Sequence, residues 1–395
     1  MLIKNKKDLE CLVADLSSFL QGKKEELSRV NKIITSDTDY WITYDYKTVL
    51  AYLSGYIKNQ YTSKSANRIK PKGKILIILS YNEPFILSII PILNALIVGN
   101  EVTLKPSREA EDFVRMIWLE SGFVEKYSLN LKIVSTKSHS ETEELIKGVR
   151  AVYFFGSHKT AKLIDKICGD NYVEFYPEIE TSDCKIFNGN SKAIKRDVKL
   201  TLRESFTHSG QTCQRIHGIF VQKNIFNDYL KTLRQEFTKL CSSRELNKFI
   251  SSEYESNRKG MIESFLADIN KAEADEIVKI KELPVLVINP KQNSDYVCNA
   301  YFLPVLWISV FESREELVQI LNFRKFFLGL NIQSEDGDFS DYIINNTKFT
   351  RYTINTSHAN IRPKEGWGGS WPSGFSGYKS WLEHFSDGYT VLGKL

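Results

Sequence analysis

The chain has 395 residues, of which 42% are hydrophobic and 26% are charged, a composition that is ordinary for a soluble globular protein. A chain of this length predicts about two or three domains. The formal net charge of +5 comes from 53 basic and 48 acidic residues spread along the sequence, so we expect no nucleic-acid partner. The longest apolar run, residues 85–98, is interrupted by polar residues and by Pro91, so we expect no membrane span.

Six cysteines are scattered along the chain, and none of them forms a C-x-x-C pair. This spacing argues against a zinc site or a redox pair, and we expect no metal centre. Scattered cysteines in a chain of this size indicate a reducing compartment. The first residues lack an apolar segment after their lysines, which argues against a signal peptide, so we expect a cytoplasmic protein.

The first half of the chain alternates between strand and helix patterns. Apolar residues at helical spacing predict helices over 6–26 and near 46–59, and a second group of helices is expected over 84–98, 108–122, 139–148 and 158–168. Short apolar runs predict strands at 74–79, 101–105, 131–135, 151–155 and 172–176. Such alternation predicts a doubly wound parallel sheet, which binds ligands at the carboxyl ends of its strands.

The second half repeats the alternation less regularly and predicts a second α/β lobe. Helices are expected at 192–206, 224–240, 255–272 and 313–322, and strands at 216–221, 284–288, 305–311, 327–333 and 351–355. We therefore expect a cofactor-binding domain over 1–177 and a catalytic domain over 178–357. Residues 358–395 are expected to pack back on the body of the molecule.

One turn stands out for its chemistry. The small polar residues 209–212 lead directly into Cys213, and a strand pattern follows. A cysteine on such a turn can have backbone N–H groups beside its sulfur, which lowers a thiol pKa and can hold an oxyanion. An isolated cysteine is more often a half-buried structural residue. His208 is five residues away, too poorly placed for a Cys–His pair, and we expect a structural or oxyanion-adjacent role for it.

This turn resembles the active-site segment of the aldehyde dehydrogenase superfamily, in which the nucleophilic cysteine follows Gly-Gln-x. Further stretches between about Lys72 and Val391 match that superfamily in the same order. The resemblance implies an α/β fold with a doubly wound parallel-sheet cofactor domain and a second α/β catalytic domain. It also implies that Cys213 is the nucleophile.

The segment Ser80-Tyr81-Asn82-Glu83-Pro84 ends the first expected strand and is similar to the family's Pro-Trp-Asn-Phe-Pro motif. A side-chain amide at a strand end can donate a hydrogen bond to a developing oxyanion. The resemblance assigns this role to Asn82, although Ser80 and Glu83 depart from the motif. Without the resemblance, such a segment is more often a turn that merely starts the next helix.

Two stretches resemble the cofactor-binding motifs of the family. Lys105 and Ser107 match the family's Lys-Pro-Ser, whose lysine holds the adenosine ribose, and Gly156-Ser157 matches the strand-to-helix turn that contacts the diphosphate. NAD-preferring members often carry a glutamate where this chain has Arg108, and a cation there suits a 2′-phosphate. The resemblance therefore implies NADP or NAD as the cofactor, with Arg108 favouring NADP.

The base that activates water in this family belongs to a Glu-Leu-Gly-Gly motif, and the matching position is Glu178, 35 residues before Cys213. The two glycines are replaced by Glu180 and Thr181, so Glu174 and Glu180 remain alternative bases. Phe302 matches a residue that packs against the nicotinamide. Ala300 replaces the glutamate that would bond the nicotinamide ribose.

Near the C-terminus, Trp367-Gly-Gly and Ser373-Gly374-Phe375 are similar to a paired glycine motif of the family. Trp367 and Trp371 indicate an aromatic wall of a pocket, or else ordinary packing.

Three functional hypotheses follow. The first is an NAD(P)-dependent aldehyde dehydrogenase acting on a small-molecule aldehyde. The second is the same fold working in reverse on an acyl thioester, as in acyl-CoA reductases, which the lost glycines and Ala300 favour. The third is a non-catalytic binding or scaffold relative. Because the chain ends soon after Val391, where relatives have a pairing strand, we expect a homodimer rather than a tetramer.

Overall fold

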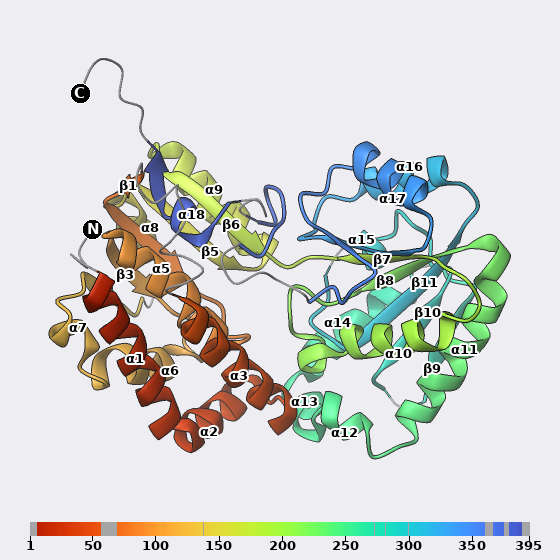
Figure 1. Cartoon of the computed structure of the whole chain (residues 1–395), viewed down its shortest axis with the longest axis horizontal. Coiled ribbons are helices and arrows are strands. Elements are labelled where there is room, and N and C mark those ends of the chain that lie inside the picture. The colour runs from red at the N-terminus through yellow and green to blue at the C-terminus, as the bar shows by residue number, and fades with distance from the viewer. Residues whose placement is uncertain are drawn as a thin grey trace.

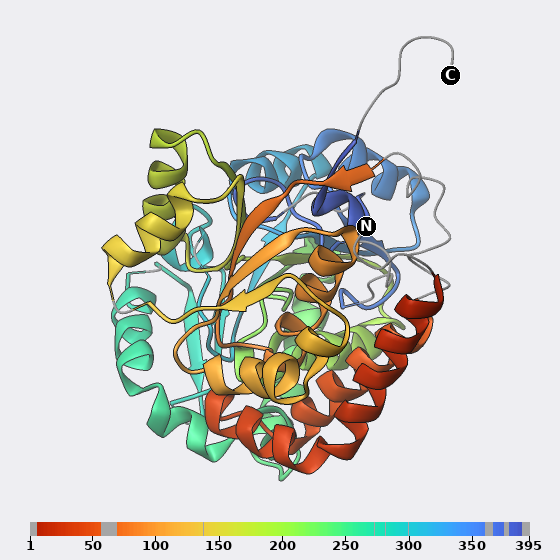
Figure 2. The ribbon, with the colours of Figure 1, turned by 90° about the vertical axis from the view of Figure 1, so that its left-hand side faces the viewer.

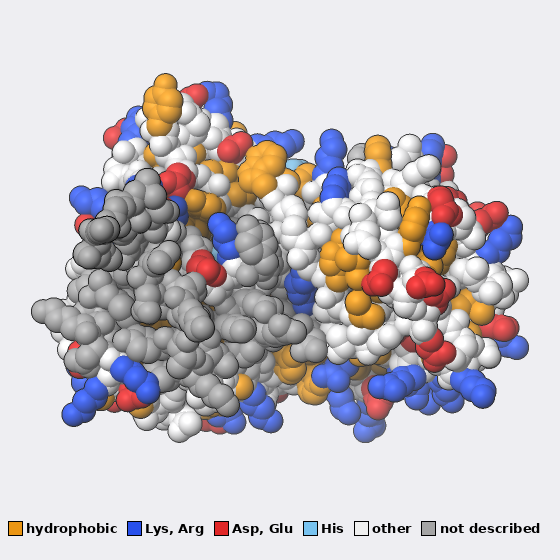
Figure 3. Space-filling view, turned by 45° about the horizontal axis from the view of Figure 1, so that its top comes forward, with side chains coloured by type: hydrophobic (Ala, Val, Ile, Leu, Met, Phe, Trp, Pro, Cys, Tyr) orange, Lys and Arg blue, Asp and Glu red, His pale blue; other side chains and the backbone are white. Residues whose placement is uncertain are grey.

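The computed structural model describes residues 6–56, 69–136, 138–271, 273–280, 282–298, 300–359, 366–374 and 379–388. It has two lobes, each built around a parallel sheet, with the N-terminal helices along one side of the first lobe (Figures 1 and 2). No described helix is both long and apolar enough to cross a lipid bilayer. Basic and acidic side chains are interspersed over the coloured part of the face in Figure 3.

The chain begins with three helices, α1 (Lys6–Gly22), α2 (Lys24–Thr35) and α3 (Asp39–Tyr56). The expected helix over 6–26 is thus two helices, separated at Lys23. α1 places Leu9, Leu12, Leu16 and Leu20 on one buried stripe against the first lobe.

The first lobe contains a five-stranded parallel sheet in the order β4-β3-β2-β5-β6. Its strands are β2 (Lys74–Ile78), β3 (Glu101–Lys105), β4 (Leu131–Ile133), β5 (Ala151–Gly156) and β6 (Glu174–Ile179). The connecting helices are α4 (Pro84–Leu87), α5 (Ile90–Val98), α6 (Glu111–Arg115), α7 (Phe123–Lys126), α8 (His139–Lys147) and α9 (His158–Asp170). The doubly wound sheet expected from the sequence is confirmed.

The second lobe contains a seven-stranded sheet in the order β13-β12-β7-β8-β11-β10-β9, in which only β9 runs antiparallel to its neighbour. The strands are β7 (Cys184–Asn188), β8 (Gly218–Gln222), β9 (Glu276–Lys279), β10 (Val285–Ile288), β11 (Val305–Phe311), β12 (Leu330–Ser334) and β13 (Tyr352–Ile354). The helices are α10 (Ile194–Ser205), α11 (Lys223–Cys241), α12 (Leu246–Phe249), α13 (Ser252–Asn257), α14 (Lys259–Ile269), α15 (Asp295–Cys298), α16 (Arg314–Phe323) and α17 (Gly337–Asn346).

The C-terminal segment returns to the first lobe. β14 (Ser386–Gly388) pairs antiparallel with β1 (Ile69–Pro71), and α18 (Trp381–His384) precedes it. Trp381 and Phe385 join the hydrophobic core of that lobe. The division at residues 177 and 178 remains a prediction, and β6 continues through the five-stranded sheet to Ile179. Val391 lies outside the described residues.

Hydrogen bonds from the N-terminal helices reach the second lobe. Thr38 Oγ1 donates to the Lys248 carbonyl at 2.8 Å, and the Trp41 indole donates to the Phe249 carbonyl at 3.3 Å. These contacts bring the α2–α3 region against α12, and Ser209 of the turn before Cys213 donates to the same Phe249 carbonyl at 3.3 Å.

Candidate active site

A cavity of about 710 Å³ has walls from both lobes. Eight of the nine residues that the sequence assigned to chemistry or cofactor binding line it, namely Asn82, Lys105, Ser107, Gly156, Ser157, Glu178, Cys213 and Phe302. The ninth, Arg108, is exposed on the turn after β3 and is not part of the cavity wall. The structure therefore brings together residues that are separated by more than 200 positions in the chain.

The turn before Cys213 has an unusual backbone. His208, Ser209 and Gly210 have φ values of 52°, 56° and 86°, so three successive residues are left-handed. A Cβ on Gly210 would lie 2.2 Å from the carbonyl carbon of Leu303, so only glycine fits there. A chain forced into this shape needs strong contacts to hold it.

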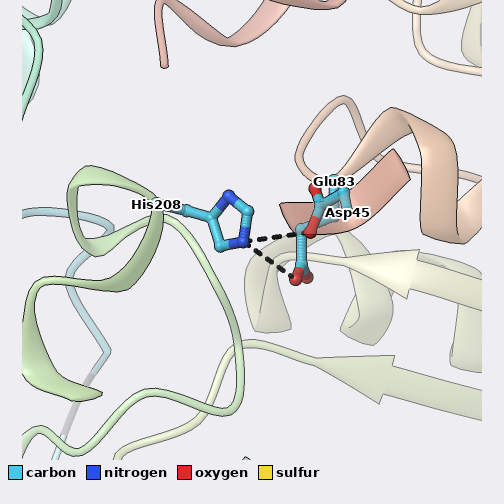
Figure 4. A group of neighbouring side chains, drawn as sticks. All are labelled: Asp45, Glu83 and His208. Atoms are coloured by element: carbon cyan, nitrogen blue, oxygen red, sulfur yellow. Dashed lines mark ion pairs between the residues drawn. The ribbon is translucent and has the colours of Figure 1, made fainter. Parts of the chain in front are cut away.

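His208 supplies those contacts and is itself buried (Figure 4). Its Nδ1 lies 2.7 Å from Asp37 Oδ2, and its Nε2 lies 3.2 Å from Asp45 Oδ1 and 3.9 Å from Glu83 Oε1. Burial alone would lower the pKa of His208, but the charges of Asp45 and Asp37 outweigh it and raise the pKa well above its usual value. His208 is therefore an imidazolium that ties the turn to the first lobe.

Asp45, Glu83 and His208 also have the spacing of a metal site, with ligand atoms within 4.8 Å of one another. The contacts of His208 with Asp37 and Asp45 account for the cluster as a hydrogen-bonded network. The cluster agrees with the structural role expected for His208. Its partners Asp37 and Asp45 are more than 160 residues away, and no sequence signal pointed to them.

Asn82 is buried at the end of β2 and faces the same turn. Its Nδ2 donates to the Gln211 carbonyl at 3.1 Å, and its Oδ1 accepts from Ser80 Oγ at 2.6 Å. This pairing fixes the amide orientation and leaves the second N–H of Nδ2 for another acceptor. The next residue, Glu83, accepts from Thr212 Oγ1 at 3.0 Å, beside the nucleophile.

Cys213 is half-buried and faces carboxyl groups. Burial raises the pKa of the Cys213 thiol well above its usual value, and the charges of Glu83 and Glu178 raise it further. Burial also raises the pKa of Glu83 to about 7. These effects favour the protonated thiol, which needs a proton acceptor before it can attack a substrate.

Glu178 is the penultimate residue of β6, opposite Phe155 on β5, and it is buried. Its pKa is raised well above the usual value by burial and by the charge of Glu83. Among the described residues no cation forms an ion pair with it, so its carboxyl can exchange a proton with neighbouring groups. Glu174 lies elsewhere, with its carboxylate 2.5 Å from Lys72 Nζ, outside the wall of this cavity.

The cofactor residues lie at the carboxyl ends of β3 and β5. Ser157 caps α9 by accepting from the Thr160 N–H at 3.3 Å. A Cβ on Gly156 would lie 2.6 Å from the Phe154 ring, which explains the glycine. Lys105 lines the cavity, and burial lowers its pKa. A ribose hydroxyl at Lys105 and a phosphate at the start of α9 fit these residues.

Sequence reasoning missed Arg215, which is 1% exposed. Its guanidinium donates to the carbonyls of Val305 and Tyr301, both at 2.7 Å. Burial lowers its pKa to about 9. Arg215 thereby fixes the segment that carries Phe302 into the cavity. The sequence around Arg215 contains no motif that predicts its hydrogen bonds to distant carbonyl groups.

The C-terminal prediction is only partly right. Trp367 lines the cavity, and its carbonyl accepts from Gln214 Nε2 at 3.2 Å. Trp371 is 67% exposed and lies outside the cavity wall, so its expected part in an aromatic wall is wrong. Phe375 lies outside the described residues.

A cavity between two lobes built on largely parallel sheets, beside a capped helix start, is typical of a dinucleotide-binding protein. The sequence model of the aldehyde dehydrogenase family matches residues 5–392, and the chain belongs to this family. It is accordingly an NAD(P)-dependent oxidoreductase of aldehydes, which confirms the expected family, fold and class of reaction.

Similar proteins agree with this assignment. The 4,4'-diaponeurosporen-aldehyde dehydrogenase of Staphylococcus aureus is 26% identical over 80% of this chain and 70% of its own length. The dimeric NADP-preferring aldehyde dehydrogenase of Rattus norvegicus is 25% identical over 82% of this chain and 73% of its own. A betaine aldehyde dehydrogenase mutant of Staphylococcus aureus, solved in complex with NAD⁺, aligns with a TM-score of 0.81 at 19% identity, over 97% of this chain and 84% of its own.

Proposed function

We propose that the protein oxidises a small-molecule aldehyde to the acid through a thioacyl intermediate on Cys213. The observation that carries this proposal is the convergence of eight predicted residues from separate stretches on one cavity. In this proposal Asn82 is the oxyanion donor, Glu178 is the base, and Lys105, Ser107, Gly156, Ser157 and Phe302 hold the cofactor.

The chemistry begins with the thiol. The Cys213 proton passes to the Glu83 carboxylate, whose pKa of about 7 suits it to accept and return a proton, and the sulfur attacks the aldehyde carbon. The carbonyl oxygen becomes an oxyanion that accepts from the remaining N–H of Asn82 Nδ2 and from the Cys213 backbone N–H. NADP or NAD, held by Lys105, Ser107, Gly156, Ser157 and Phe302, would supply the acceptor for the hydride that leaves that carbon. The product of this step is a thioester on Cys213.

Release of the acid needs water and a base. Glu178, as the carboxylate, takes a proton from a water molecule, which attacks the thioester carbon and displaces the Cys213 sulfur. Burial and the charge of Glu83 raise the pKa of Glu178, which makes its carboxylate a stronger base. The thiolate takes back a proton, and the site returns to its starting state.

We further propose a cytoplasmic homodimer that prefers NADP. The named dimeric, NADP-preferring relative supports both the assembly and the cofactor, and the exposed Arg108 beside the cofactor residues supports the cofactor. The six cysteines, all within the described residues, form no disulfide, which supports a reducing compartment. Light scattering at several protein concentrations tests the dimer.

Intact-mass measurement after rapid quenching tests the proposed intermediate. With an aldehyde and NADP, we expect an adduct on Cys213 equal in mass to the aldehyde minus two hydrogens, and Glu178→Gln should accumulate it. An adduct that forms only from an acyl-CoA, with NADPH consumed afterwards, would establish the acyl-thioester reductase instead. No adduct from either substrate would contradict a thioacyl enzyme.

A further inference from the structure

The segment between the two sheets carries Glu180, a buried carboxylate at the start of helix α9. Its side chain is 13% exposed. Its Oε2 accepts from the His158 backbone N–H at 2.7 Å, and its Oε1 lies 2.8 Å from His158 Nδ1. The Glu180 backbone N–H in turn donates to the Gly156 carbonyl at 3.2 Å. Both Glu180 and Ser157 line the cavity.

This contact matters because the first N–H groups of a helix are where an anion binds. α9 has 13 residues and no acidic residue in its own first turn. Its N-terminal dipole therefore has no negative partner within the helix, and Glu180 provides one from outside. The Glu180 carboxylate thus occupies a backbone donor that the cofactor diphosphate is expected to use.

We propose that Glu180 competes with the cofactor diphosphate for the start of α9, so that a dinucleotide binds only when Glu180 leaves His158. The inference rests on the proposed cofactor site at Gly156 and Ser157. A diphosphate beside the Glu180 carboxylate would bring like charges together in a partly buried place, where their repulsion is poorly screened. Glu180 thus sets the affinity for the cofactor and makes its binding depend on a local rearrangement.

The surroundings of Glu180 indicate how far that rearrangement reaches. The His158 ring packs on Phe326 with ring centroids 5.4 Å apart, and the Phe326 carbonyl accepts from the Ser182 N–H at 3.0 Å. Glu180 and Ser182 belong to the same short connection between β6 and β7. Displacing Glu180 therefore acts on a connection that is tied to both lobes. Relatives of the resembled family have a glycine at this position, which offers no such competitor.

Two variants test the competition. Glu180→Gln keeps an acceptor for the His158 N–H but removes the charge, and Glu180→Gly removes the side chain. Glu312→Gln is the matched control, because Glu312 is an exposed residue of the second lobe paired with Lys223. Titration calorimetry would measure binding of ADP-ribose, which carries the diphosphate, and of adenosine, which does not. Thermal unfolding of each variant checks that it is folded.

We expect both Glu180 variants to bind ADP-ribose about tenfold more tightly than the wild type, while their affinity for adenosine and the control's affinity for both ligands stay unchanged. If Glu180→Gln binds ADP-ribose and the wild type shows no binding, the inference is also supported. Folded variants with unchanged or weaker ADP-ribose binding would overturn the inference and leave the proposed function standing. Failure of every protein to bind ADP-ribose, NAD or NADP would overturn both.

Discussion

At the scale of single residues, buried carboxyl groups around Cys213 determine how readily its thiol loses a proton. Glu83 and Glu178 both raise the pKa of Cys213, and His208 offsets part of the surrounding charge. Because a protonated thiol is a poor nucleophile, the Cys213 thiol should react slowly. Substrate and cofactor would meet a thiol that is activated only when a neighbouring carboxylate takes its proton.

This arrangement predicts slow alkylation of Cys213. The rate of its reaction with iodoacetamide should rise with pH toward a midpoint above 9, the ordinary thiol value. Glu83→Gln removes one negative charge and should lower that midpoint. Peptide mass spectrometry would measure the rate at Cys213, with the exposed Cys11 as an internal control. A midpoint near 7 for Cys213 would contradict the buried, negatively charged environment.

The imidazolium of His208 gives a second prediction. His208→Gln leaves Asp37 and Asp45 buried without their cation, so we expect the free energy of unfolding to fall by about 3–5 kcal/mol. Urea denaturation would measure it. His139→Gln, on an exposed position at the start of α8, is the matched control and should change stability by less than about 0.5 kcal/mol. Equal stability of the two variants would contradict a stabilising ion pair between His208 and the two aspartates.

Arg108 gives a third prediction at this scale. If it meets a 2′-phosphate, Arg108→Glu should weaken NADP binding by about 1.5–3 kcal/mol, the worth of a charged hydrogen bond, and should leave NAD binding nearly unchanged. Fluorescence titration with both nucleotides is the measurement. Equal losses for NADP and NAD would instead indicate a general disturbance of the turn after β3.

Many candidate site residues were predictable because each lies at a strand end within a recognisable local motif, as Asn82, Lys105 and Gly156 do. Asp37, Asp45 and Arg215 were not predictable, because their roles depend on residues far along the chain or on carbonyl groups that any sequence has. Glu180 was weighed only as a possible base, and its contact with His158 follows from the path of the chain after β6. A local motif can identify a site residue, but it does not show which residues far along the chain contact it.

At the scale of elements, the turn before Cys213 is the most constrained feature. Gly210→Ala places a Cβ 2.2 Å from the Leu303 backbone at a φ of +86°, so we expect a loss of about 2–4 kcal/mol in stability and loss of activity. Gly260→Ala is the control, because that glycine in α14 has nothing within 4 Å of an added Cβ. It should be neutral or stabilising by up to about 1 kcal/mol. Denaturation and turnover of both variants would check this, and an active, stable Gly210→Ala would refute the tight fit.

The parallel strands of both lobes were largely predictable, since buried strands such as β2 and β11 form continuous apolar runs. The expected strand at 172–176 lies instead at Glu174–Ile179, because pairing with β5 sets its register and no apolar run does. α17 was missed because its buried face is short, and β9 because it is a half-exposed edge strand. The pairing of β1 with β14 joins residues over 300 positions apart.

At the scale of the whole molecule, the buried acids and His208 predict how stability depends on pH. The folded-state pKa of Glu83 is raised from 4.5 to about 7, so the folded protein binds more protons than the unfolded chain across that range. The contribution of Glu83 is fully present below pH 4.5 and is lost as the pH rises through about 7. His208, whose pKa is also raised, acts in the same direction at higher pH.

Between pH 5 and pH 7, Glu83 should therefore lower the free energy of unfolding by at most about 1.4 kcal/mol per pH unit. His217, whose pKa burial lowers well below its usual value, contributes a slope of the opposite sign in this range. Glu83→Gln should remove the Glu83 contribution, because glutamine has no proton to lose, and its slope should differ from that of the wild type by this amount. Urea denaturation at several pH values would measure both proteins. A Glu83→Gln variant whose slope equals that of the wild type would contradict the raised pKa of Glu83.

The central claim is that Cys213, in a cavity closed by both lobes, carries the chemistry while the cofactor binds independently of it. The most direct test is a thermal-shift titration with NADP and NAD on the wild type and on Cys213→Ala, with aldehyde-dependent reduction of the nucleotide measured alongside. We predict that the nucleotide stabilises both proteins, by about 2.7 kcal/mol at 100 times its Kd, and that only the wild type turns over. Turnover by Cys213→Ala at the wild-type rate would contradict the account.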